Sequence, residues 1–166
     1  NVELRIDPAT GNPRVIEINP RAAGQFYDLL ERVDGYSPFD ALIDLNSGRE
    51  PALRRREGRY GHAASFVLRD LTGEGLSRWP RRREVRALQD RHPDIHAMVY
   101  PKRGADLARE MKWLGSYRYA VFNFGAPTRE ALFARFARLS AEIDFHPGGR
   151  IVPAPEAAFG RAPGDD

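Results

Sequence analysis

A short run near the start of the chain, Glu17-Ile-Asn-Pro-Arg21, carries the side chains best suited to chemistry. Side chains alternate along a β-strand, so Glu17 and Asn19 share one face. Glu3 stands on the preceding strand-like segment, where the alternation puts it on that same face. Two carboxylates and a carboxamide are the hard oxygen donors that Mg²⁺ or Mn²⁺ prefers. Arg21 follows the strand, and its planar guanidinium suits a phosphoryl or carboxylate oxygen.

A β-hairpin is expected to position these residues. Residues 2–7 and 14–19 both alternate apolar and polar side chains, and residues 7–13 are rich in the Asp, Pro, Gly and Asn of turns. We expect one face of the hairpin to be buried, and Val15 to lie on the polar face with Glu17 and Asn19. The side chains expected on the buried face are those of Val2, Leu4, Ile16 and Ile18.

The pattern also fits a surface hairpin with an ordinary polar face, because such faces are common in antiparallel sheets. The longer string from Asn1 to Arg21 favours a more specific interpretation. It resembles the end of the ATP-grasp domain in the ATP-dependent carboxylate–amine ligases, where an acid on one strand precedes a Glu-x-Asn-x-Arg string across a hairpin. The resemblance implies that Glu3, Glu17 and Asn19 are metal ligands, that Asn19 and Arg21 contact the nucleotide, and that Arg21 is catalytic.

The same resemblance implies a reaction. A ligase of this family uses ATP and Mg²⁺ (or Mn²⁺) to convert a carboxylate into an acyl phosphate, which an amine then attacks to form an amide or peptide bond. The products besides the amide are ADP and phosphate. The implied partners are therefore a small carboxylate and a small amine, and a homo-oligomer is left open.

The resemblance does not extend to the family's nucleotide pocket, whose lysines, Gly-rich flap and adenine contacts precede the hairpin. The chain has only two lysines, Lys102 and Lys112, and both come far too late. We therefore expect this chain to be a piece of a longer ligase, or to work with an upstream ATP-grasp portion, and to bind ATP poorly by itself.

The rest of the chain predicts an α+β fold in which a small sheet-and-helix lobe follows the end of the ATP-grasp domain. Apolar spacing predicts helices over 22–34, 37–48, 81–91 and 127–143, and strands over 60–71, 95–100 and 117–124. We expect four parts: the end of the ATP-grasp domain (1–48), a linker (49–59), the lobe (60–146) and a flexible tail (147–166).

Composition excludes several classes of protein. There is no cysteine, which excludes a disulfide scaffold, a cysteine-ligated zinc site and a cysteine nucleophile. No apolar run approaches the ~20 residues of a membrane span, which excludes a membrane-spanning protein. The cysteine-free chain fits the cytoplasm. The net charge of +3 is unevenly distributed, because residues 1–48 carry four arginines against eight acids. The arginine runs 54–56 and 81–83 are short and lack interleaved aromatic residues. Both runs are expected on solvated surfaces, and nucleic acid is not an expected partner.

Two other functions stay open at this point. One is a biotin-carboxylase-like carboxylase, in which bicarbonate takes the place of the acid. The other is a non-enzymatic, arginine-rich binding module, for which the hairpin would be only structural. Among the histidines, His92 and His96 have helical spacing but are separated by Pro93, which breaks the helix that would align them.

Overall fold

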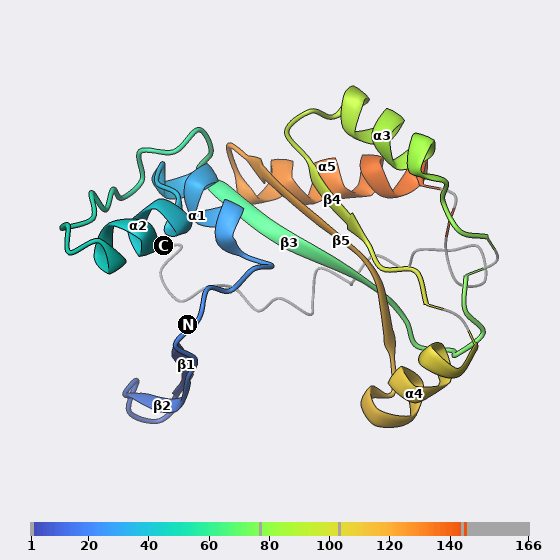
Figure 1. Ribbon diagram of the computed structural model, residues 1–166, viewed down its shortest axis with the longest axis horizontal. Helices are drawn as coiled ribbons and strands as arrows, with labels where there is room; N and C mark the ends of the chain where they lie inside the picture. The colour runs from blue at the N-terminus through green and yellow to red at the C-terminus, as the bar shows by residue number, and fades with distance from the viewer. Residues whose placement is uncertain (1, 77, 103, 144, 146–166) are drawn as a thin grey trace. The chain divides into compact units, whose positions relative to one another are not determined.

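The computed structural model describes residues 2–76, 78–102, 104–143 and 145. Within them the fold is α+β, as predicted (Figure 1). The elements in chain order are β1 (Val2–Ile6), β2 (Pro13–Ile18), α1 (Tyr27–Asp34), α2 (Pro38–Asn46), β3 (His62–Asp70), α3 (Arg82–Arg91), β4 (His96–Val99), α4 (Gly104–Leu114), β5 (Tyr117–Ala126) and α5 (Arg129–Glu142). β1 and β2 form one sheet, and the other has the order β3-β5-β4.

The chain packs into two compact units. The first comprises residues 1–65 and 123–129, and the second comprises 66–122 and 130–166. Residues 49–59, which the sequence predicts to be a linker, lie within the first unit. The expected tail, 147–166, and His146 at the end of the expected lobe lie outside the described residues.

Two short helices, α1 and α2, lie in the first unit. Gly35 ends α1 in a left-handed conformation (φ 82°), which suits a residue without Cβ. Ser37 then caps α2, its hydroxyl accepting a hydrogen bond from the Asp40 amide, and Pro38 occupies the first turn. Both boundaries agree with the sequence. α1, however, begins at Tyr27 rather than near residue 22. Gly24 disfavours helix in the residues before it.

The segment 49–59 has no regular structure, but its second half is held against α1. The Gly58 amide donates to the Val33 carbonyl at 3.0 Å, and the Tyr60 amide donates to the Arg32 carbonyl at 3.0 Å. A Cβ at Gly58 would lie 2.3 Å from the Arg32 carbonyl oxygen, so only glycine allows this approach. Backbone hydrogen bonds of this kind leave no signature in the composition of the segment.

The core of the second unit is centred on β5, which lies between β3 and β4. Within this unit Tyr117, Tyr119, Val121 and Phe122 are all buried, as expected for a central strand. α5 packs on β3 through Phe66 and Phe136, whose rings stack at 4.1 Å between centroids, and it also buries Leu132 and Leu139. The two tyrosines are therefore core residues.

No helix or strand was expected over residues 104–114, where the structure has α4. None of its residues is buried, and Trp113 and Leu114 are exposed. Leu107, Met111 and Leu114 do recur at helical spacing. The pattern is short and lies between glycines, so it is weak.

A buried carboxylate, Asp70, organises the turn after β3. It accepts hydrogen bonds from the amide and hydroxyl of Thr72 at 2.8 and 2.7 Å, and from the amides of Gly73 and Gly75 at 3.1 and 2.8 Å. Burial by itself would raise the pKa of Asp70, but these hydrogen bonds outweigh it and the pKa is lowered. The ionised carboxylate therefore stabilises the fold.

Asp70→Ala is expected to lower the free energy of unfolding by about 2–3 kcal/mol at neutral pH, because it leaves several donors without their acceptor. Since the folded-state pKa is lowered, this stabilisation is present above the unfolded pKa of about 3.9 and is lost as pH falls through the folded value. Urea unfolding at pH 7 and at pH 3 measures both effects. Glu74 lies in the same turn and its side chain is exposed. Glu74→Ala is therefore the control, and it should change the free energy of unfolding little.

Candidate functional site

The two glutamates predicted to bind metal face each other across the hairpin. β1 and β2 pair antiparallel, with Glu3 directly opposite Glu17. Side chains at directly opposite positions share a face, with Cβ atoms about 4.5–5.5 Å apart. Neither carboxylate has a hydrogen bond or ion pair with another described residue. Two like charges placed so closely destabilise a sheet unless a cation lies between them.

One expectation about the faces of the hairpin is wrong. The register shifts after Glu3, so that Leu4 pairs with Val15 and Ile16 is the extra residue of a β-bulge. Val15 therefore lies on the apolar face with Leu4, rather than with Glu17. Beyond the bulge Arg5 faces Arg14. A bulge changes the alternation by one residue, and nothing in Arg14–Asn19 distinguishes it from a regular strand.

The expected burial of the apolar face is also wrong for the described chain. Every residue of β1 and β2 is exposed. Val2, Leu4, Ile16 and Ile18 have exposed fractions between 52% and 66%. Alternation shows that a strand has two different faces, whereas burial also requires a second layer to cover one of them.

Asn19 and Arg21 follow β2 directly. The Arg21 amide donates to the Asn19 carbonyl at 2.8 Å, which turns the chain sharply just past the strand. Asn19 lies two residues beyond Glu17, a distance of about 6.5 Å along an extended chain. The Arg21 side chain is exposed and forms no ion pair with the residues that the structure describes. It is therefore available to a ligand.

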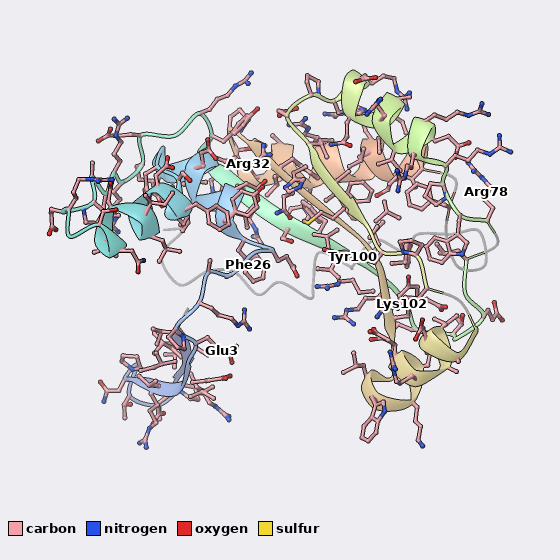
Figure 2. The ribbon with its side chains drawn as sticks, in the orientation of Figure 1. Glu3, Phe26, Arg32, Arg78, Tyr100 and Lys102 are labelled. Atoms are coloured by element: carbon pink, nitrogen blue, oxygen red, sulfur yellow. The ribbon has the colours of Figure 1, made fainter. Side chains whose placement is uncertain are left out.

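The acid nearest in sequence to Arg21 on α1, Asp28, is engaged elsewhere. Its carboxylate accepts hydrogen bonds from the Arg32 guanidinium at 3.1 Å and from the side-chain amide of Asn123 at 2.7 Å. Asn123, which is fully buried, also donates to the Gln25 carbonyl at 2.6 Å. This network ties the start of α1 to the end of β5 within the first unit. Figure 2 shows Arg32 on α1 and Glu3 on the hairpin.

The donors around Glu3 fit a magnesium ion. Within the described ranges no three or more His, Cys, Asp and Glu side chains are grouped to hold a metal. Magnesium, however, is commonly bound by one or two carboxylates, with substrate phosphates and water completing its shell. The carboxylates of Glu3 and Glu17 and the amide oxygen of Asn19 are donors of that type. His92, by contrast, ends α3 and pairs with Glu142 at 3.0 Å, while His96 begins β4, so they form no joint site.

A feature that sequence reasoning missed lies beside Arg21. A hollow of about 760 Å³, called here the apolar hollow, is bounded by residues 19–23, α1, α2 and Leu53. Of the residues that the structure describes, Arg21 is the only charged one that lines it. Figure 2 shows Phe26 beside α1. Its other large apolar and aromatic side chains are those of Tyr27, Leu29, Leu30, Tyr36, Leu42, Leu45 and Leu53.

The wall of the apolar hollow is well supported. Tyr27 of α1 packs against Phe39 of α2, with ring centroids 4.8 Å apart. The buried hydrogen bonds of Asn123 hold Gln25 and Asp28, which flank Phe26 and Tyr27. In the sequence these apolar residues look only like the inner faces of two helices. Their exposure, 47% for Phe26 and 58% for Leu45, shows that they are not fully covered.

Comparison of the chain with protein-family models, curated proteins and solved structures gives no match. No helix among the residues that the structure describes is long and apolar enough to cross a membrane. The features that bear on function are therefore the geometry of the hairpin, Arg21 and the apolar hollow.

Proposed function

We propose that this chain is the C-terminal part of an ATP-grasp ligase that joins a carboxylate to an amine with ATP. The observation that carries the proposal is the direct pairing of Glu3 with Glu17, followed at once by Asn19 and by Arg21, which has no acidic partner among the described residues. Two facing carboxylates repel each other and destabilise the hairpin slightly. A divalent cation between them would offset that repulsion.

Each residue then has a role. Glu3, Glu17 and Asn19 hold Mg²⁺, which when bound neutralises charge on the phosphates of ATP. Arg21 donates hydrogen bonds to the carboxylate oxygen that receives the phosphoryl group. Its turn from Asn19 places it next to the metal ligands. A preorganised donor at this point stabilises the charge that develops on the transferred group.

The reaction balances without a further reactant. A carboxylate oxygen attacks the γ-phosphorus of ATP, the bond to ADP breaks, and an acyl phosphate forms. The amine attacks the carbonyl carbon and loses a proton, and phosphate leaves with one oxygen of the original carboxylate. ATP is held together with an upstream ATP-grasp portion, since Lys102, one of the two lysines here, pairs with Glu110. We place the enzyme in the cytoplasm.

Isotope transfer tests this chemistry. In the enzyme that contains this chain, an acid labelled with ¹⁸O in its carboxylate should transfer one ¹⁸O atom to each phosphate released, because that oxygen bridges carbon and phosphorus in the acyl phosphate. Mass spectrometry of the phosphate measures the transfer. The control is unlabelled acid in ¹⁸O-water, which should leave the phosphate unlabelled. Label that enters from water but not from the acid would mean simple ATP hydrolysis.

A further inference from the structure

The apolar hollow suggests which acids the proposed ligase activates. Its wall is apolar and aromatic, and among the described residues Arg21 is its single charged lining residue. No acid and no lysine of the described ranges lines it. A ligand that complements such a site has one negative charge and an apolar body. We propose that the apolar hollow holds the alkyl or aryl body of a monocarboxylate, with the carboxylate at Arg21.

This inference rests on the proposed function, because it takes the Arg21 ligand to be the acid that is activated. Charge complementarity sets the orientation of that acid. The guanidinium lies at the segment 19–23, next to the proposed metal ligands, whereas Leu42, Leu45 and Leu53 come from α2 and the loop beyond it. An acid held in this way presents its carboxylate to the metal side and its body to the leucines.

The volume of the apolar hollow also suits an organic acid with an apolar body. Its volume of about 760 Å³ lies within the range of about 300–1,000 Å³ typical of sites for organic ligands. Bicarbonate would leave most of this space unfilled and has no apolar group to contact the wall. Among the two enzymatic functions left open by the sequence, the apolar hollow therefore favours an amide-forming ligase over a carboxylase.

Direct binding to this chain, without nucleotide or metal, tests the proposal. The probes are octanoate, hexanoate and octylamine, titrated by isothermal calorimetry. Octanoate should bind saturably, and hexanoate about 15-fold more weakly, because each buried methylene contributes about fourfold. Octylamine has an alkyl body one methylene longer and a positive charge, and it should still bind at least tenfold more weakly than octanoate. Arg21→Ala should remove most of that preference for the anion.

A matched pair of variants on α2 locates the site. Leu45 and Ile43 are both 58% exposed, but only Leu45 lines the apolar hollow. Leu45→Asp should lower octanoate affinity at least tenfold, since it places a carboxylate against the acid's body. Ile43→Asp makes the same chemical change outside the hollow and should leave affinity within twofold. If Leu45→Asp does not fold, as judged by circular dichroism, Leu53→Asp takes its place.

The outcomes separate this inference from the proposed function. Octanoate binding that Leu45→Asp abolishes and Ile43→Asp spares supports the hollow as an acid site, even if the isotope experiment fails. Equal effects of the two variants, or equal binding of octanoate and octylamine, would overturn it. So would dissociation of an oligomer by Leu45→Asp without any octanoate binding, because a second copy of the chain would then cover the hollow. The ligase chemistry would stand in each of these cases if ¹⁸O transfer is seen.

Discussion

Arg21→Ala is expected to reduce kcat by about 10²–10³, while the KM for Mg-ATP stays close to that of the unaltered enzyme. The guanidinium contacts an oxygen that gains charge as the phosphoryl group moves, so its contribution is greater in the transition state than in the ground state. Arg21→Lys should recover only part of the rate, because an ammonium lacks the two-pronged geometry of a guanidinium. Steady-state kinetics with ATP as the varied substrate measure both parameters.

Thermal denaturation of the same variants distinguishes a catalytic role from a structural one. Arg21 is exposed and pairs with no described acid, and Asp28 is already bonded to Arg32 and Asn123. The melting temperature of Arg21→Ala should therefore match that of the unaltered protein. Arg32→Ala is the contrasting control, because it breaks the partly buried pair with Asp28 and should lower the melting temperature. A near-normal kcat for Arg21→Ala would remove Arg21 from the mechanism.

Glu17→Gln is expected to reduce metal-dependent turnover at least 10²-fold and to shift the magnesium dependence to higher concentration. The amide keeps the shape of the side chain but removes one of the two charges that hold the ion. Glu3→Gln should behave in the same way, because the residues are directly opposite. Initial rates measured across a magnesium titration give both quantities.

The stability of Glu17→Gln should move in the other direction. Replacing one of two facing carboxylates relieves their repulsion, which is worth about 0.2–1 kcal/mol across a sheet. Without metal the variant should be as stable as the unaltered protein or slightly more stable. Glu31→Gln, an exposed glutamate of α1, is the matched control and should change neither turnover nor its magnesium dependence. If Glu17→Gln turns over normally at every magnesium concentration, the proposed ligands are wrong.

Local chemistry made much of the fold predictable. Ser37, Gly35 and the segment Tyr117–Phe124 each specify a structure through their immediate neighbours: a helix cap, a helix end and a strand. These assignments are correct. Features that depend on distant partners were not predictable. The hydrogen bonds from Gly58 to Val33 and from Asn123 to Asp28 join residues far apart in the chain, and together they define the first unit.

The candidate site was only partly predictable for the same reason. Alternation predicts that Glu3 and Glu17 share a face, and the observed register places them directly opposite. The bulge at Ile16 changes the faces farther along the strand, and no residue type marks it. The apolar hollow depends on how α1, α2 and Leu53 pack, so the sequence could show its leucines but not the space between them.

The binding of Mn²⁺ to this chain tests the metal site most directly, since it needs neither substrate nor any other part of the enzyme. Paramagnetic Mn²⁺ broadens the NMR signals of nearby amides. We predict broadening centred on Glu3, Glu17 and Asn19 that magnesium reverses, that Glu17→Gln removes and that Glu31→Gln leaves intact. Broadening centred on other acids, or equal broadening in the two variants, would contradict a metal site on the hairpin and the ligase function that depends on it.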